Sequence, residues 1–225
     1  YYLKLSDLYR QKKHDEAERL AIEAILKYPY NSDLYFWRAK NLYAWLPEMV
    51  YPSAVLELII DLYTKAIEID PNYFAFYFWR GAANYFSKNY NESITDLNKS
   101  IKLKTRYKSE DVFSKEDKNI YALIGMSHFR QNNYNESIKF LNKALETGFT
   151  SLQNAIFKNV DNTIFIHRHL AFSHYQLGEF NLASQSVEKD IKSNPNNSLS
   201  YFIKALITGR NKSYNHFVNA FRLYL

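Results

Sequence analysis

The amino-acid sequence predicts an all-α fold, a right-handed α-solenoid of about six helical hairpins. Two observations carry this prediction. Short motifs recur at separations of 42 and 44 residues, and self-similarity at such a period indicates a repeat architecture. The chain also contains only five Gly and five Pro in 225 residues, too few for the many tight turns of a β-sandwich or barrel. We therefore expect helices throughout and no β-sheet.

The recurring motifs divide the chain into units. Tyr-Phe-Trp-Arg occurs at 35–38 and 77–80, and Asn-Tyr-Asn-Glu-Ser-Ile occurs at 89–94 and 133–138. Positions are counted from the start of each unit, so that the Tyr of the first motif is fourth. The six predicted units begin just before Tyr1 and near Ser32, Phe74, Lys118, Ile164 and Ser198.

The first half of each unit has the period of a helix. Its fourth, eighth and twelfth positions are four residues apart and so share one helix face. The fourth position holds Tyr1, Tyr35, Tyr77, Tyr121, His167 and Tyr201. The eighth, which is small in most units, holds Leu5, Ala39, Gly81, Gly125, Ala171 and Ala205. A small side chain lets two helices approach closely, so we expect the eighth position to pack tightly against the partner helix.

The second half of each unit is also helical in pattern. Pro29, Pro71 and Pro195 follow three of these segments and mark their exits, because proline cannot extend a helix. Each unit is therefore predicted to be a helical hairpin. The second helices are expected to start near residues of good N-cap type, namely Asp15, Ser53, Asn91, Asn135 and Asn181.

The third unit runs from Ala75-Phe-Tyr-Phe-Trp-Arg-Gly81 through Tyr90-Asn-Glu-Ser-Ile94 to Lys102. It resembles the tetratricopeptide repeat, a helix–turn–helix of about 34 residues. The resemblance extends over the whole chain, with departures such as Asp190 where the family has Ala. It implies a single solenoid domain over 1–225, which we expect to be a segment of a longer protein. Three insertions, at 46–52, 104–117 and 148–163, are expected to be loops, the last one able to extend a helix.

The resemblance also implies a concave groove lined by the first helix of each hairpin. By this resemblance, the second, fifth, ninth, twelfth and thirteenth positions of the helix face the groove. The fifth and twelfth are mainly aromatic, and Lys40, Arg130 and Arg168 add positive charges. We expect this groove to bind an extended peptide or an amphipathic helix. The predicted groove residues are Phe36, Lys40, Tyr43, Phe78, Tyr85, Phe129, Arg130, Arg168, Phe172 and Tyr175. The sequence leaves open the alternative that these rings pack between adjacent hairpins.

The sequence offers little for catalysis or for a cofactor. The chain has no Cys, which removes disulfides, thiolate metal sites and cysteine nucleophiles, and it has no Gly-rich phosphate loop. His167, His169 and His174 are spaced by two, five and seven residues, whereas a helical metal pair needs three or four. We therefore expect no enzyme, no cofactor and no metal. The lack of Cys slightly favours the cytoplasm, although an upstream targeting sequence would lie outside this chain.

Charge bears on the choice of partner. The net charge is +6, and residues 189–225 hold six basic residues against one acid. RNA or an acidic partner, bound by stacking aromatics and this basic C-terminal part, is thus an alternative to a polypeptide ligand. Nucleic acid is less favoured, because Phe36 and Phe78 occupy the fifth position where RNA-reading pentatricopeptide hairpins carry small polar residues. Self-association through an apolar C-terminal helix is a further alternative, and no apolar run reaches transmembrane length.

Overall fold

In the computed structural model, residues 1–46, 52–104, 116–147, 166–193 and 195–209 are described. Over these residues the chain forms α-helices and no β-strand, as predicted. The first helices of the hairpins are α1 (Tyr2–Arg10), α3 (Ser32–Trp45), α5 (Phe74–Phe86), α7 (Glu116–Arg130), α9 (Ile166–Gln176) and α11 (Ser198–Gly209). The second helices are α2 (His14–Lys27), α4 (Pro52–Ile69), α6 (Tyr90–Lys104), α8 (Tyr134–Glu146) and α10 (Phe180–Ser193).

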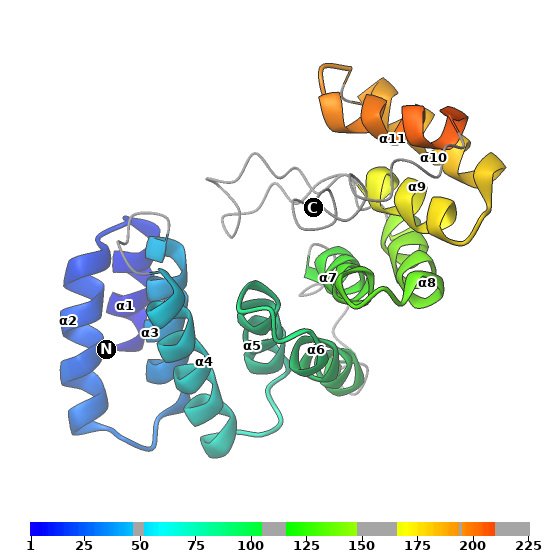
Figure 1. Ribbon diagram of the computed structural model, residues 1–225. Helices are drawn as coiled ribbons and strands as arrows, with labels where there is room; N and C mark the ends of the chain where they lie inside the picture. Colours follow the sequence, from blue (N-terminus) through cyan, green and yellow to red (C-terminus); the bar gives the residue numbers. More distant parts are fainter. Residues whose placement is uncertain (47–51, 105–115, 148–165, 194, 210–225) are drawn as a thin grey trace.

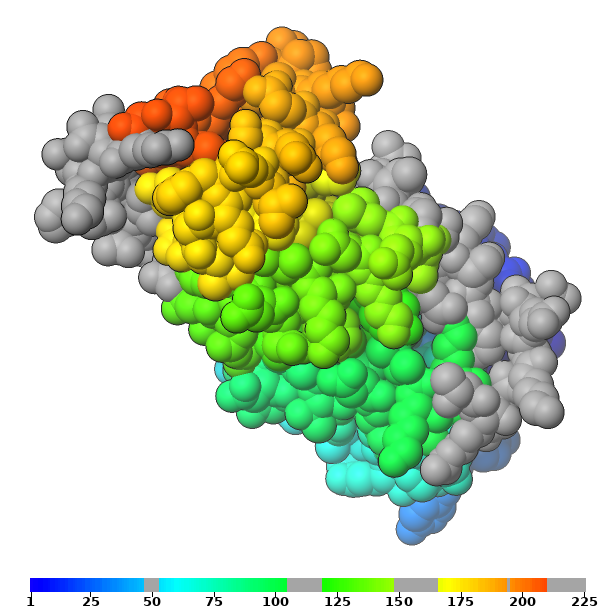
Figure 2. All heavy atoms as spheres, turned by 90° about the vertical axis from the view of Figure 1, so that its right-hand side faces the viewer, coloured from blue at the N-terminus to red at the C-terminus, as the bar shows by residue number. Residues whose placement is uncertain are grey.

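The helices pair into five hairpins, and α11 is the first helix of a sixth. The hairpins follow one another along a curved array from α1 to α11 (Figure 1), and in the space-filling view consecutive hairpins form adjoining layers (Figure 2). Each second helix contacts the first helix of the next hairpin. The predicted solenoid of hairpins is thereby confirmed, and the second helix of the sixth hairpin would fall at 210–225, outside the described residues.

The predicted insertions lie almost wholly outside the described residues. At their edges, Pro52 begins α4 and Lys104 ends α6. Glu116 and Asp117, predicted as part of a loop, instead form the start of α7.

The turn inside four of the five hairpins has one repeated backbone conformation. Lys12, Lys88, Asn132 and Gly178 occupy equivalent places in this turn, and each has a positive φ, between 58° and 77°. The backbone N–H of the residue after each one donates to a carbonyl five residues earlier, at 2.8–3.0 Å. This bond is that of a Schellman motif, which satisfies the free carbonyls at the end of the first helix.

In four hairpins, the same turn explains why the predicted N-caps were wrong. The second helices begin at His14, Pro52, Tyr90, Tyr134 and Phe180, one residue before the predicted capping residues. Those residues therefore lie in the first turn. The N-cap of α2 is Lys13 and that of α8 is Asn133, and neither makes a side-chain cap hydrogen bond. The Schellman turn leads directly into the second helix, so its geometry sets the helix start.

The fourth-position tyrosines connect successive hairpins. The hydroxyl of Tyr35 donates to the carbonyl of Pro29, and the hydroxyl of Tyr77 donates to that of Pro71, each at 3.0 Å. In both cases the proline lies in the connection from the preceding hairpin. The Pro and Tyr of the repeat thus work together, because the phenol holds the connection against the start of the next helix.

At the eighth position of the third and fourth hairpins, the two helices approach each other closely. A Cβ added to Gly125 would lie 2.8 Å from Cγ and Cδ2 of Leu141 in α8, and one added to Gly81 would lie 2.9 Å from Cγ of Leu97 in α6. Ordinary contacts between carbon atoms are about 3.5–4.0 Å. The predicted tight packing of this position is confirmed.

We expect Gly125→Ala to lower the free energy of unfolding by about 1–3 kcal/mol, because the new methyl group overpacks the contact with Leu141. Helix propensity alone would change stability in the opposite direction, by about 1 kcal/mol. The matched control is Gly209→Ala in α11, where an added Cβ meets nothing within 4 Å. Thermal unfolding followed by circular dichroism measures both, and an equal response of the two variants would contradict the close approach.

The left-handed turn gives a second prediction. Lys88 has a φ of 64°, a conformation that costs a non-glycine residue about 1–2 kcal/mol. We expect Lys88→Gly to raise the melting temperature by about 2–4 °C. Gly178→Ala, at the equivalent place with a φ of 77°, should lower it. A fall in stability on Lys88→Gly would show that this conformation is not strained.

Candidate functional site

The first helices of the first three hairpins converge on the side chain of Lys40. Its Nζ lies 4.7 Å from the ring centroid of Trp79 and 5.1 Å from that of Trp37. The rings of Tyr9 and Phe36 are each 5.4 Å away. All four distances are within the range of about 6 Å for a cation–π interaction. We call Lys40, Tyr9, Phe36, Trp37 and Trp79 the Lys40 box; its residues come from α1, α3 and α5.

Buried rings support the two tryptophans of the box. Trp79 makes edge contacts with Phe78 at 5.2 Å and with Tyr43 at 6.1 Å, measured between ring centroids. Trp37 makes edge contacts with Phe36 at 5.8 Å and with Tyr9 at 5.7 Å. Phe36, Tyr43 and Phe78 are buried, whereas the two tryptophans and Tyr9 are half-buried. The arrangement fixes partly exposed rings on a buried aromatic layer.

The predicted groove residues differ in exposure. Lys40, Tyr85, Arg130 and Tyr175 are half-buried. The other six are buried, namely Phe36, Tyr43, Phe78, Phe129, Arg168 and Phe172. Phe78 is 1% exposed and Phe172 is fully covered, so in this structure both pack between helices. Whether the surface binds a partner stays a prediction, and the residues open to one belong to the half-buried set.

Ring contacts bring most of the predicted residues into two groups, one on α3 and α5 and the other on α7 and α9. Phe86 links Tyr43, at 6.2 Å, to Tyr85, at 5.2 Å. Further along the array, Phe172 contacts Phe129 at 5.7 Å and Tyr175 at 6.3 Å. Tyr85 also faces Arg130 of the next hairpin: burial raises the pKa of the Tyr85 hydroxyl, and the charge and hydrogen bond of Arg130 oppose that rise.

Sequence reasoning missed Trp37 and Trp79, the central rings of the Lys40 box. They occupy the sixth position, whereas the groove was predicted from the second, fifth, ninth, twelfth and thirteenth. The signal was present in the repeated Tyr-Phe-Trp-Arg motif, which carries Trp at that position in both copies.

Arg168, predicted to be a cation in the groove, lies in a buried ion pair. Its Nε donates to Oδ2 of Asp190 at 3.3 Å, and the hydroxyl of Ser200 donates to the same oxygen. Burial lowers the pKa of Arg168, and Asp190 opposes this shift. Asp190 occupies the place that the buried Ala24 has in α2. The pair explains this departure from the repeat, because the carboxylate balances the charge of Arg168, at the fifth position of the same hairpin.

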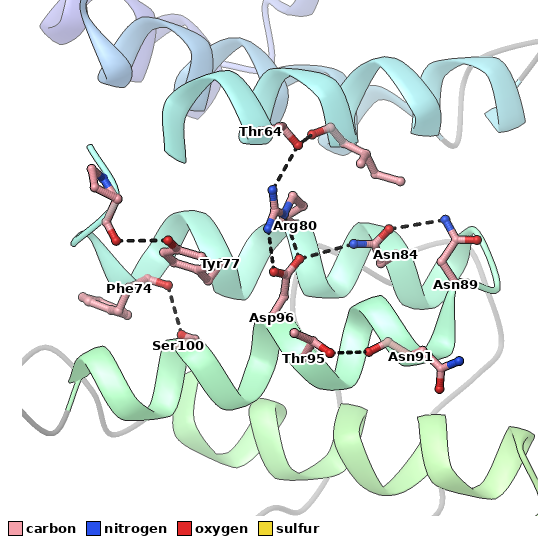
Figure 3. A network of polar contacts seen from close by, with 12 residues as sticks. Thr64, Phe74, Tyr77, Arg80, Asn84, Asn89, Asn91, Thr95, Asp96 and Ser100 are labelled. Atoms are coloured by element: carbon pink, nitrogen blue, oxygen red, sulfur yellow. Dashed lines mark hydrogen bonds and ion pairs between the residues drawn. The ribbon is translucent and has the colours of Figure 1, made fainter. Parts of the chain in front are cut away.

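A second ion pair, between the half-buried Arg80 and the buried Asp96, lies in the third hairpin (Figure 3). Arg80 of α5 donates through Nε and Nη2 to the two oxygens of Asp96 in α6, at 2.8 and 2.7 Å, and through Nη1 to Thr64 of α4 at 3.1 Å. Asn84 donates to the same carboxylate at 3.3 Å. The network connects three helices, and hydrogen bonding to Asp96 raises the pKa of Arg80. Arg38 pairs with a single oxygen of Glu18, Oε1, through Nη2 at 2.7 Å and Nε at 2.8 Å.

The three clustered histidines have separate surroundings. His169 packs edge-on against Phe129, with ring centroids 4.8 Å apart, and Nδ1 of His174 lies 2.6 Å from Oε2 of Glu179. Burial lowers the pKa of His167. Within the described ranges, no group of three or more His, Asp or Glu side chains is placed to hold a metal ion.

The basic C-terminal part is described only in part. Lys204 forms an ion pair with Glu188 at 2.6 Å, so this charge is balanced locally. Arg210, Lys212 and Arg222 lie outside the described residues, as does the C-terminal helix predicted to self-associate. None of the helices in the described part of the chain is long and apolar enough to cross a membrane.

Comparison with known proteins agrees with this geometry. Residues 119–147, which cover most of α7 and all of α8, match the family model of the tetratricopeptide repeat. These residues of the fourth hairpin are therefore a tetratricopeptide repeat. No curated protein sequence matches it significantly.

Several solved structures, among them that of a TPR protein, share the fold. The MamA protein has a TM-score of 0.62 at 16% identity, over 85% of this chain and 88% of that one. YrrB, described as a TPR protein with an unusual peptide-binding site, has a TM-score of 0.66 at 11% identity over 91% of both chains. PilF of Pseudomonas aeruginosa has a TM-score of 0.62 at 14% identity, over 93% of this chain and 82% of that one. At these identities the likeness is one of fold.

The buried pair at Asp190 gives a prediction for stability. We expect Asp190→Ala to lower the free energy of unfolding by about 3–5 kcal/mol, because it leaves the buried Arg168 without its carboxylate. The double variant Arg168→Met with Asp190→Ala should recover at least half of that loss, since no buried charge remains. Chemical denaturation of both variants measures this, and additive losses would show that the two side chains do not interact.

Proposed function

We propose that the protein is a non-catalytic scaffold that binds an extended polypeptide along the surface formed by the first helices of its hairpins. The observation that carries this proposal is the Lys40 box, where α1, α3 and α5 place half-buried rings around one cation. Tetratricopeptide folds are typical of protein-interaction scaffolds, which supports the class of function.

Fixed aromatic rings favour a polypeptide as ligand. Trp37 and Trp79 are held by the buried rings beneath them, so little side-chain freedom is lost when a ligand covers them. Tryptophan and tyrosine dominate the binding energy of many protein interfaces. Equivalent side chains repeat from one hairpin to the next, which suits an extended chain whose own side chains recur at a regular spacing.

Lys40 adds a preference to this surface. Its ammonium group lies among the rings and adds a positive charge to an otherwise apolar patch. We therefore expect ligands that combine apolar side chains with an acidic group. YrrB carries a peptide-binding site on the same fold, which supports a peptide as the ligand class.

Nucleic acid is the weaker alternative. The protein's rings at the fifth position, Phe36 and Phe78, are buried, so they are not free to stack on bases. Lys204 of the basic C-terminal part is already paired with Glu188. If RNA were the ligand, its affinity would fall steeply as salt is raised.

The test uses peptides selected against the chain from a displayed random library, with affinities measured by calorimetry. We expect Trp79→Ala to weaken binding at least fivefold, equivalent to about 1 kcal/mol. The control is Leu182→Ala, which removes an exposed side chain of α10 and should leave affinity unchanged. Selected peptides whose affinity is the same for wild type, Trp37→Ala and Trp79→Ala would contradict the proposed surface.

A ring that only packs inside the protein should affect stability and not affinity, and Phe78 tests this. Phe78 is buried beneath Trp79, so Phe78→Ala should lower stability by about 3–5 kcal/mol while the folded fraction still binds. A loss of affinity without a loss of stability in this variant would place Phe78 in direct contact with the ligand.

A further inference from the structure

Four large apolar side chains are exposed at the C-terminal end of α2 and in the turn that follows it. Leu26 and Tyr30 are 80% and 88% exposed, and Ile22 and Tyr28 are 41% and 46% exposed. We call these four residues the α2 patch. Single exposed apolar residues are ordinary, but a group of this kind indicates an interaction surface.

The other hairpins show that the fold does not need these residues. In the second hairpin, at an offset of 42 residues, the α2 patch is replaced by Thr64, Glu68, Asp70 and Asn72. When the second helices are aligned on their buried residues, the place of Leu26 is charged in every other hairpin, with Glu68, Lys102, Glu146 and Lys192. The place of Ile22 is polar, with Thr64, Asn98, Asn142 and Glu188. The first hairpin alone among the five is apolar at both positions.

Two residues of the α2 patch, Ile22 and Leu26, face away from the described part of the array, whereas the ring of Tyr28 contacts that of Tyr1, with centroids 5.8 Å apart. Ile22 and Leu26 are one turn apart, on the side of α2 opposite to Ala17, Ala21 and Ala24, which are buried against the rest of the protein. In Figure 1, α2 is the outermost helix at the N-terminal end of the array.

Charges beside the patch are arranged to match a second copy of the same helix. Glu23 and Lys27 are exposed, one turn apart, and directly follow Ile22 and Leu26 in sequence. Within the chain, Glu23 accepts a hydrogen bond from the hydroxyl of Tyr1 at 3.0 Å, and Nζ of Lys27 lies 5.6 Å from the ring centroid of Tyr28. If two α2 helices lie antiparallel about a twofold axis near residues 24 and 25, Ile22 of one copy meets Leu26 of the other. Glu23 then lies beside Lys27 of the other copy, and the contact occurs twice by symmetry.

We propose that the α2 patch is the interface of a symmetric homodimer, with two α2 helices packed antiparallel. The four side chains expose roughly 500 Å² per copy, going by the usual areas of large apolar residues. Two copies would bury about 1,000 Å², near the lower limit for a specific interface, before any contact of the flanking charges is added. This surface lies on the outer side of the array, and the proposal does not depend on the peptide-binding groove.

The first experiment measures the mass of the 225-residue chain by sedimentation equilibrium, at concentrations up to about 200 μM because an interface of this size is of modest affinity. The wild type should form dimers. Leu26→Glu with Tyr30→Asn, which copies the residues of the second hairpin, should raise the dissociation constant at least tenfold. Leu182→Glu is the matched control, since it removes an exposed leucine from α10, and it should dimerise like the wild type.

The second experiment tests the antiparallel pairing itself. Glu23→Lys and Lys27→Glu should each weaken the dimer, because each places like charges opposite one another. An equimolar mixture of these two variants should dimerise again, as every lysine then meets a glutamate. A monomeric wild type would overturn the proposal, and so would a dimer that the α2 variants leave intact or a mixture that fails to recover.

Discussion

The arrangement of the whole molecule depends on the close approach of two helices at the eighth position of each hairpin. At Gly125 there is no room for even one further carbon atom beside Leu141, and Gly81 is nearly as close to Leu97. This contact sets the distance within the hairpin, and the left-handed turn after the first helix sets its entry into the second. Hairpins of one shape then stack in one way, which brings the first helices side by side and forms the Lys40 box.

The repeated Tyr-Phe-Trp-Arg motif shows how one turn of helix serves four contacts. In the third hairpin, Tyr77 binds the carbonyl of Pro71, Phe78 enters the core, Trp79 lies over Lys40, and Arg80 pairs with Asp96. Successive residues of a helix are rotated by about 100°, so four neighbours point in four directions. The first helix therefore contacts the preceding hairpin, its own partner helix and the candidate binding surface at once.

The sequence predicted the period, the hairpins and the small eighth position, because these follow from spacing and side-chain size. It did not predict how deeply each ring is buried. Spacing places Phe36 and Phe78 on a face of the helix, but the rotation of neighbouring hairpins decides whether that face is covered, and here it is. The pairing of Arg168 with Asp190 was also missed, since a residue 22 positions away carries no local signal. Trp37 and Trp79 could have been predicted as site residues, because both lie in the repeated Tyr-Phe-Trp-Arg motif.

In a repeat protein, each hairpin can be compared with the others at equivalent positions. The residues that depart from the common pattern here are of two kinds. Asp190 departs from the small residue of the other second helices, and Arg168 of the same hairpin balances it. This departure is compensated by a second residue of the same hairpin, so it affects the stability of the protein. Ile22 and Leu26 depart from the polar residues of the other hairpins, and no described part of the chain covers them. A change that costs solubility and gains no internal contact is explained by a contact outside the chain. The unmatched departure therefore points to a partner, and the charges of Glu23 and Lys27 indicate which one.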